Sequence, residues 1–467
     1  MSLTFVNLVY LASAVLFILG IKGLTKPKTA VRGNVMSSLA MLIAVVITLF
    51  DRNIVTYEYI IAGGVAGAVV GGIMAVRVKM TSMPQMVALL NGFGGGASLG
   101  VAAGQYLLAV HSTGFEPGAM GVISVIFIML TVLIGSVTLS GSLVAFAKLQ
   151  ELISGKPIGF VGMKFLNAGL FIAALALVAL LAINPGQETM FWIMVAVACV
   201  LGLTLVLPIG GADMPVVIAL LNSYSGVAAA TAGFIMGNTV LIVAGSLVGT
   251  SGLILTKIMC VAMNRSLTNV LFGVMGATDG QTYNDDEFYA GKVKSAQADE
   301  VAMMLETAKR VVIVPGFGMA MAQAQHAVRE LADAIEAKGG EVEYAIHPVA
   351  GRMPGHMNVL LAEAKVPYEK LVEMDRINPT FKETDVAIVI GANDVTNPMA
   401  RESEGSPIYG MPILNVDQAK TVVVIKRSLS SGFAGLPNPL FAMDNTYMVF
   451  GDGKKAVIEM TTALTES

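Results

Sequence analysis

Two adjacent cations and a hydroxyl follow a short apolar run near the C-terminus of this 467-residue chain. The run from Thr421 to Ile425 is rich in β-branched residues, which is typical of a buried strand, and Lys426, Arg427 and Ser428 come directly after it. Two cations and a hydroxyl suit a phosphate monoester, because all three side chains donate hydrogen bonds to phosphoryl oxygens. The alternative is a solvated strand end. The glycine-rich segment that continues through Gly432 favours a loop that covers a ligand.

A strand-to-helix turn offers a second candidate phosphate site. Arg310 to Pro315 reads as a buried strand, Gly316 and Gly318 follow it, and a helix is expected from about 319 to 338. At such a turn a phosphate can approach backbone N–H groups and a helix N-terminus. Met321 stands where a third glycine or alanine is usual, so the fingerprint is incomplete.

The choice between NADP and NAD depends on the end of the second strand. A domain specific for NAD normally ends this strand with an aspartate or glutamate that binds the ribose hydroxyls. Here the strand from Glu341 to Ile346 is followed by His347 and Pro348, without a carboxylate. Together with the cations at 426 and 427, this pattern favours NADP, which carries an extra 2′-phosphate.

Two further loops follow predicted strand ends. The segment 349–354 offers Arg352 to a pyrophosphate, and the segment 391–395, after a strand from Val386 to Ile390, offers the Asn393 amide and the Asp394 carboxylate. Glycines in such loops often serve turns alone. A cluster of glycine, asparagine and aspartate directly after a strand favours a ligand site.

A separate set of polar residues lies within long apolar stretches. Asn91, Ser142 and Asn222 fall inside candidate membrane spans, and Asp213 lies at the inner end of the span that holds Asn222. Amides and hydroxyls at such depths are able to line a wetted proton path. The alternative is that they only hydrogen-bond neighbouring helices.

Nine apolar stretches are long enough to cross a bilayer. They lie near 5–23, 35–50, 57–76, 84–110, 120–147, 165–183, 189–208, 214–236 and 239–261. The loops that would face inward carry most of the lysines and arginines, including Lys148, Lys156 and Lys164, so the N-terminus is expected outside and the C-terminal half inside. Glycines spaced four apart, at 63, 67 and 71 and at 92, 96 and 100, predict close helix packing within the bundle.

The polar C-terminal half is expected to form an α/β domain. Its strands, with a fifth from Tyr447 to Phe450, alternate with helices, which predicts a Rossmann-like, doubly wound parallel sheet. We therefore expect a transmembrane α-helical bundle over 1–264, a linker over 265–305 and a nucleotide-binding domain over 306–467. Hydrophobic residues make up 55% of the chain and charged residues 13%, which agrees with a large membrane part. The net charge of −3 argues against a nucleic-acid partner.

Six longer strings resemble the β subunit of the proton-translocating NAD(P) transhydrogenase over essentially the whole chain. They are GGADMPVV from Gly210, LNSYSG from Leu221, PGFGMAMAQAQ from Pro315, HPVAGRMPGHMNVLLAEA from His347, GANDVTNP from Gly391 and KRSLSSGFAG from Lys426. The resemblance implies a proton-conducting bundle and a soluble domain that binds NADP(H) in an orientation flipped relative to ordinary Rossmann proteins. Hydride would pass directly to or from NAD(H) on a partner subunit, with no catalytic side chain and no metal.

The resemblance also assigns site residues. Those expected to contact NADP(H) are Gly316, Phe317, Gly318, Val349, Ala350, Gly351, Arg352, Met353, Pro354, Gly391, Ala392, Asn393, Asp394, Val395, Gly410, Met411, Lys426, Arg427, Ser428, Gly432, Phe433, Asp452 and Gly453. Those expected on the proton path are Asn91, Ser142, Asp213 and Asn222. The partners implied are α subunits that carry the NAD(H) domain and further helices, in a dimer of αβ units within a bacterial inner membrane, with the nucleotide domain in the cytoplasm.

The chain departs from the family pattern at two positions. Asn91 stands where some members have a histidine, which makes a histidine on a partner helix the expected titratable group. Phe433 replaces a tyrosine that is common in the ligand-covering loop. Two other classes remain as alternatives: a channel or transporter gated by a nucleotide, which would need a selectivity filter, and a membrane-anchored NADP dehydrogenase, which would need an acid or base such as His347 or His356.

Overall fold

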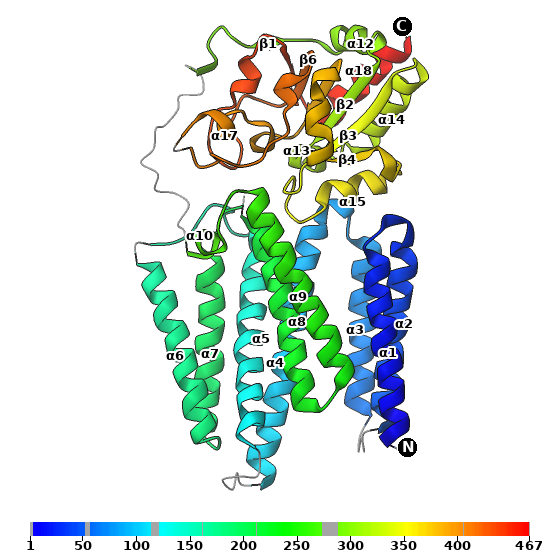
Figure 1. The fold of residues 1–467 in the computed structure, drawn as a ribbon. Coiled ribbons are helices and arrows are strands. Elements are labelled where there is room, and N and C mark those ends of the chain that lie inside the picture. Colours follow the sequence, from blue (N-terminus) through cyan, green and yellow to red (C-terminus); the bar gives the residue numbers. More distant parts are fainter. Residues whose placement is uncertain are drawn as a thin grey trace.

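The chain folds into a bundle of long helices and a sheet domain that lies against one end of the bundle (Figure 1). The structure is a computed structural model that describes residues 3–51, 57–113, 121–160, 162–211, 213–272, 288–404 and 406–466. The N-terminus lies at the end of the bundle away from the sheet domain, and the C-terminus lies in the sheet domain.

Nine helices of the described residues are long and apolar enough to span a membrane, as the sequence predicts. They are α1 (Leu3–Leu24), α2 (Pro27–Asp51), α3 (Glu58–Arg77), α4 (Met83–Thr113), α5 (Val122–Leu149), α6 (Met163–Ile183), α7 (Glu188–Val206), α8 (Met214–Met236) and α9 (Thr239–Ala262). A short turn, η1 (Met80–Ser82), precedes α4, and α10 (Leu267–Phe272) follows α9.

Helices α5 and α8 form the centre of the bundle, and glycines allow their neighbours to approach closely. A Cβ on Gly226 of α8 would lie 2.4 Å from the backbone nitrogen of Gly249 on α9. Likewise, a Cβ on Gly95 of α4 would lie 2.9 Å from the Gly135 carbonyl oxygen of α5. Because no side chain fits between these backbones, the helices pack in direct contact.

Among the described residues, no helix packs against the glycine stripe of the third span, although the sequence predicts close packing there. No residue of α3 is buried, and a Cβ on any of its glycines at 63, 67 or 71 would meet no described atom within 4 Å. In α4, a Cβ on Gly92 or Gly96 would meet side chains of α5, whereas a Cβ on Gly100 would meet no described atom within 4 Å. Spacing alone creates a flat helix face, whereas the rest of the fold decides whether another helix covers it.

The sheet domain holds seven parallel strands in the order β1-β7-β6-β5-β2-β3-β4. They are β1 (Lys294–Ser295), β2 (Arg310–Pro315), β3 (Glu341–Ile346), β4 (Leu371–Glu373), β5 (Val386–Ile390), β6 (Thr421–Lys426) and β7 (Thr446–Phe450). The order reverses between β2 and β5, which makes their carboxyl ends the switch point where ligands of open α/β sheets bind. The predicted doubly wound class is confirmed; the short strands β1 and β4 are additional to the five predicted strands.

Helices and short turns cover both faces of the sheet and bury one apolar core on each side. The helices are α12 (Ala298–Glu306), α13 (Phe317–Met321), α14 (Gln325–Ala337), α15 (His356–Glu363), α16 (Met374–Ile377), α17 (Met399–Glu402) and α18 (Gly453–Glu466). The short turns are η2 (Tyr368–Lys370), η3 (Asn378–Glu383), η4 (Asp394–Thr396), η5 (Val416–Gln418) and η6 (Pro439–Ala442). The single helix predicted from about 319 to 338 is wrong, because Gln323 adopts a left-handed φ of 50° and separates α13 from α14.

The linker predicted over 265–305 differs from the structure at both ends. Helix α10 packs on the bundle through Val270, which is buried with residues of α5 and α8. At the other end Tyr289, β1 and α12 belong to the sheet domain, where Tyr289 and Val301 are buried in its cores. Residues 273–287 lie outside the described residues, and the acidic run at 285–287 falls among them. The strand β1 could not be predicted from this polar segment, because two residues show no periodicity.

Candidate functional site

The carboxyl ends of β2 and β5 meet in a tight contact between glycines. The N–H of Gly316 donates to Ile390 O and the N–H of Gly318 donates to Gly391 O, each over 2.9 Å. The two predicted phosphate donors at 316 and 318 are therefore already used, since the turn is closed against β5. The approach requires glycine: a Cβ on Gly391 would lie 2.3 Å from Met319 N, and its φ is 68°.

Replacing Gly391 by alanine is expected to destabilise the sheet domain by about 2 kcal/mol, because the backbone strain and the close contact both penalise a Cβ. The measurement is the free energy of unfolding from a denaturant titration, in which limited proteolysis of the sheet domain reports the unfolded fraction. Gly339 also has a left-handed φ, of 92°, but a Cβ there would meet no described atom within 4 Å, so Gly339→Ala isolates the strain. Equal losses for the two variants would show that the contact at Gly391 contributes nothing.

The loop after β5 lies directly beneath the glycine-rich loop after β6. Asp394 Oδ2 accepts a hydrogen bond from the Ala434 N–H over 3.1 Å. A Cβ on Gly432 would lie 2.5 Å from Asp394 Oδ1, so the two loops touch at a position where only glycine fits. Asn438 donates to Asn393 Oδ1 over 3.0 Å and holds that side chain in place. The structure thus brings Asn393 and Asp394, from the loop after β5, together with Gly432 from the loop after β6.

Two polar atoms in this contact are buried without a hydrogen-bond partner among the described residues. They are Asn393 Nδ2 and Asp394 Oδ1, a donor and an acceptor. Burial raises the pKa of the Asp394 carboxyl, while the Ala434 N–H and the Lys426 charge act in the opposite direction. Buried polar groups are normally paired, so a polar ligand that inserts beneath the Gly432 loop would satisfy both atoms.

The predicted phosphate-binding group stands at the end of β6, beside that contact. Lys426 is the last residue of β6; its ammonium lies 5.1 Å from the centre of the Phe441 ring and donates to Ser430 O. Arg427 and Ser428 are exposed, and Ser428 Oγ lies 3.0 Å from Ser430 Oγ. Since β5 and β6 are adjacent, the cations and the Asn393–Asp394 pair share one edge of the sheet.

Arg352, predicted to bind a pyrophosphate, faces the membrane bundle in this structure. Its guanidinium lies 4.2 Å from the centre of the Phe317 ring and donates to Leu149 O over 3.0 Å and to Glu151 over 3.2 Å. Leu149 is the last residue of α5. Arg352 therefore joins the turn after β2 to the C-terminal end of α5, and its contact with a nucleotide stays a prediction. Ala350 and Met353 beside it are buried, and Val349 packs on the bundle.

Both histidines that flank this loop are buried and engaged by the backbone. His347 Nδ1 accepts from the Val349 N–H over 3.2 Å and its Nε2 donates to Pro412 O over 2.8 Å. His356 Nδ1 accepts from the Arg352 N–H over 3.1 Å. Burial lowers the pKa of each histidine to about 4. These backbone contacts give both histidines a role in shaping the loop, while His356 Nε2 is buried without a hydrogen-bond partner among the described residues.

Acidification is expected to destabilise the sheet domain as the pH falls from about 6.5 to about 4. An unfolded histidine has a pKa near 6.5, whereas that of folded His347 is about 4. The unfolded state binds more protons in this window, so the stabilisation is complete above pH 6.5 and is lost as the pH approaches 4. The free energy of unfolding should fall less steeply on acidification in His347→Gln than in the wild type. His326→Gln, which alters an exposed histidine, should leave this pH dependence unchanged. Equal pH dependence in both variants would contradict the assignment.

The remaining predicted contacts have structural roles of their own. A Cβ on Gly410 would lie 2.3 Å from Asn264 Nδ2, which donates to Tyr409 O over 2.9 Å, so this loop touches the segment after α9. Met411 is buried in a core of the sheet domain. Asp452 Oδ1 accepts from the N–H groups of Lys454 and Lys455 and caps α18, while Gly453 begins that helix. Their contacts with NADP(H) stay predictions.

Three of the four predicted proton-path residues lie where α4, α5 and α8 meet. Asn91 Nδ2 donates to Ile218 O of α8 over 3.2 Å. A Cβ on Gly92 would lie 3.2 Å from the Cβ of Ser142, whose hydroxyl is buried without a partner among the described residues. Asn222 follows Ile218 by one turn of α8 and so lies on the face toward α4. Asn91 and Ser142 therefore lie close together, whereas the place of Asn222 beside them follows from the helix period alone.

Asp213, the fourth residue, lies at the N-terminal end of α8 in contact with a cation. Its carboxylate is 3.4 Å from the Arg265 guanidinium, and both side chains are largely buried. Burial raises the pKa of the Asp213 carboxyl, and Arg265 opposes that shift. Two residues earlier, a Cβ on Gly211 would lie 3.4 Å from the Phe433 ring of the glycine-rich loop. The candidate nucleotide loop thus rests on the turn that carries Asp213.

Lys148 is expected from the sequence only as a charge in an inner loop. In the structure it is 3% exposed in the last turn of α5, and its ammonium donates to backbone carbonyls. A signal was present: Lys148 follows Gly141 and Ala145 at helical spacing, on the small-residue face of α5.

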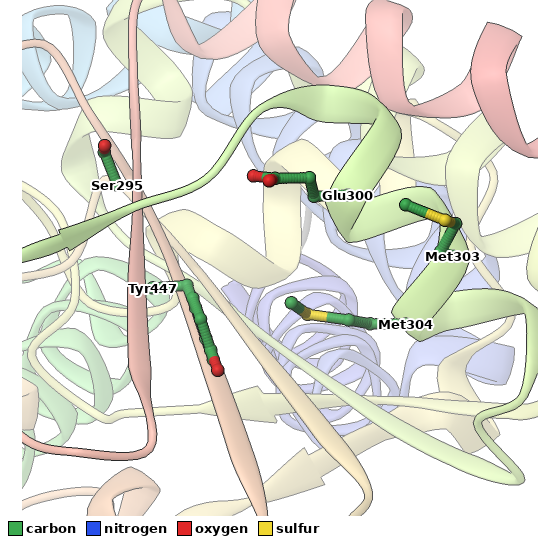
Figure 2. Close-up of a pocket in the computed structure, with 5 residues that line it drawn as sticks. All are labelled: Ser295, Glu300, Met303, Met304 and Tyr447. Atoms are coloured by element: carbon green, nitrogen blue, oxygen red, sulfur yellow. The ribbon is translucent and has the colours of Figure 1, made fainter.

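The described part of the chain has no cluster of three or more metal-binding side chains. One surface cavity of the sheet domain lies away from the predicted site. This cavity of about 410 Å³ is lined by Ser295, Glu300, Met303, Met304 and Tyr447, which come from β1, α12 and β7 (Figure 2). Tyr447 is near the start of β7, whereas the predicted site lies at the opposite, carboxyl ends of β2, β5 and β6. The cavity therefore has no part in that site.

The fold defines a multi-pass membrane protein with a Rossmann-like domain docked on one end of its helices. A family model described as NAD(P) transhydrogenase beta subunit matches residues 6–463. Two proteins of Rhodospirillum rubrum, each named NAD(P) transhydrogenase subunit beta, are 47% identical to the chain over 456 residues, which cover 97% of this chain and 98% of each relative. The chain belongs to the NAD(P) transhydrogenase beta subunit family.

Proposed function

We propose that this chain binds NADP(H) at the carboxyl edge of β5 and β6 and couples hydride transfer with NAD(H) on a partner subunit to proton movement through its helices. The observation that carries the nucleotide site is the buried, unpartnered pair Asn393 Nδ2 and Asp394 Oδ1 beneath Gly432. A buried donor and acceptor that lack partners fit a polar ligand.

The residues present fit the phosphates of NADP as well. Lys426, Arg427 and Ser428 would hold the 2′-phosphate, because they stand beside that pair and offer two positive charges and a hydroxyl. When bound, the nicotinamide supplies or receives the hydride, so no side-chain nucleophile is needed. The chain's own task is to position the nucleotide and exclude water. The loop that contains Gly432 would exclude water by covering the proposed site, where the ring centres of Phe433 and Phe317 are 5.9 Å apart.

The membrane half is proposed to carry the protons. Asn91, Ser142 and Asn222 supply polar groups at the contact of α4, α5 and α8, and Asp213 supplies a carboxylate at its inner end. The excess of lysine and arginine on one side supports a bacterial inner membrane orientation with the N-terminus outside and the nucleotide domain in the cytoplasm. A histidine on a partner helix would supply the titratable group that Asn91 lacks.

Direct contacts between the two halves support coupling. Phe433 rests on Gly211 near the Asp213–Arg265 pair, and Arg352 reaches the end of α5. A change of protonation or hydration at the inner end of the bundle would therefore act on the loops that hold the nucleotide. The described residues contain one Rossmann-like sheet, so the site for NAD(H) is proposed to lie on an α subunit, with two αβ units forming a dimer.

The test is to purify the chain with its partner from the native membrane and reconstitute both in sealed vesicles. Addition of NADPH and NAD⁺ is expected to drive proton movement, reported by a pH-sensitive dye, only when both nucleotides and both subunits are present. Hydride transfer without proton movement would reject the coupling. Turnover by this chain alone would reject the proposal that a partner subunit carries the NAD(H) site.

A further inference from the structure

A buried lysine lies between the membrane helices and the sheet domain. Lys148 Nζ lies 2.5 Å from Leu207 O, 2.7 Å from Ile209 O and 3.4 Å from Lys156 O, so all three donors of the ammonium face carbonyl oxygens. The described residues place no carboxylate within ion-pair distance of it. A buried cation held only by carbonyls is costly to keep, and removing it would leave several acceptors unpaired.

The carbonyls belong to two segments that Lys148 draws together. Leu207 and Ile209 follow α7, where backbone carbonyls form the negative end of the helix dipole. Lys156 lies in the loop after α5. The two segments also bond each other, since the Ile158 N–H donates to Leu207 O and the Gly211 N–H donates to Gly155 O, each over 3.0 Å. We call residues 148–160 and 207–211 the inner platform, with Lys148 at its centre.

The nucleotide loops rest on this inner platform at two points. Leu149, the neighbour of Lys148, accepts the hydrogen bond from Arg352. Gly211, four residues after Leu207, supports the Phe433 ring. The platform also leads into α8, which carries Asp213 and Asn222. The inner ends of α5 and α8, and the two loops proposed to hold NADP(H), therefore share one set of contacts.

We propose that Lys148 is a positioning residue for proton-coupled turnover, an inference that rests on the proposed function. Its ammonium ties the end of α5 to the turn between α7 and α8, so that a displacement of these helices moves Arg352 and the Gly432 loop together. Without the ammonium, α5 and the turn move independently, and the membrane half no longer acts on the nucleotide loops. Lys148 is not one of the residues proposed to hold the nucleotide or to form the polar contact of α4, α5 and α8.

Lys148→Met tests this role, because methionine keeps an unbranched stem and removes the donors. Lys164→Met is the matched control; Lys164 is an exposed lysine at the start of α6, at the same end of the bundle. The complex with its partner subunit is reconstituted in vesicles. Two rates are measured. The first is the rate of a single hydride transfer from NADPH that is already bound, and the second is the steady-state rate of turnover with and without an imposed proton gradient.

In Lys148→Met the acceleration of turnover by the gradient is expected to fall by about tenfold, while the single turnover changes less than about twofold. The control should match the wild type. Full acceleration in Lys148→Met, or a proportional loss of both rates, would overturn the proposal. If that variant does not assemble, Lys148→Arg serves instead, because arginine keeps the charge but not the geometry. It should show reduced acceleration by the gradient with a normal single-turnover rate. Two unchanged rates, or two rates reduced in proportion, would again overturn the proposal. A wild type without acceleration would instead reject the proposed function.

Discussion

Replacing Lys426 and Arg427 together by alanine is expected to weaken NADP(H) binding about a hundredfold, because two charge-assisted hydrogen bonds to a phosphate are lost. Affinity for NAD(H), which lacks the 2′-phosphate, should change less than about twofold. The measurement is equilibrium titration of the purified complex with each nucleotide. In the structure the Lys426 ammonium lies over Phe441 and bonds Ser430 O, so binding requires it to turn toward the phosphate.

The matched control for that pair removes the same charge from the opposite edge of the sheet. Lys309 and Lys382 are exposed and precede β2 and β5, away from the carboxyl ends where the ligand is proposed to bind. Lys309→Ala with Lys382→Ala should leave both affinities unchanged. A similar loss of NADP(H) affinity in the control would mean that overall charge, and not a phosphate contact, sets the affinity. An equal loss for NADP(H) and NAD(H) in the first pair would reject the 2′-phosphate assignment.

Asn222→Leu is expected to lower proton-coupled turnover about a hundredfold, the scale of a lost group in a proton-transfer path. Leucine has a similar size but neither accepts nor donates a hydrogen bond, so it interrupts the polar contact that includes Asn91 and Ser142. NADP(H) binding to the complex should be retained, since Asn222 lies within α8 and the proposed nucleotide site lies in the sheet domain. Turnover in sealed vesicles and nucleotide titration are the two measurements.

Asn167→Leu is the control for that substitution. Asn167 is also an asparagine in a membrane helix, but it lies on α6, where it is buried and donates to Thr204 O over 3.3 Å. Turnover within about threefold of the wild type is expected for this variant, the effect of one lost neutral hydrogen bond on local packing. Equal inhibition by the two substitutions would return Asn222 to a packing role, and normal turnover in Asn222→Leu would exclude it from the path.

The predicted and observed folds agree most closely where a pattern is long or strongly repeated. Nine apolar segments and five strand segments were predictable, because burial in lipid or in a sheet needs a suitable local composition. The departures occur in short or irregular segments. The two-residue strand β1 has no detectable period, and the break at Gln323 follows from one left-handed residue inside a sequence otherwise suited to a helix.

The candidate site was predictable in part for the same reason. Strand ends could be located along the sequence, so Asn393, Asp394 and Lys426 were expected at one edge of the sheet. The contact of Asp394 with Gly432 and Ala434 was not predictable, since it depends on how two loops fold over each other. The position of Arg352 on the end of α5 was likewise beyond reach, because the partners are about 200 residues apart in the chain.

The sequence by itself determined the two halves of this protein, their element types, the family and the residue types able to bind a phosphate. These follow from local composition, periodicity and ordered strings, which do not depend on distant contacts. Only the tertiary structure decided that Lys148 is buried among carbonyls, that α3 lacks a covering helix within the described chain, and that the nucleotide loops rest on the turn beside Asp213. Such contacts join residues far apart in the chain, so their geometry arises from packing.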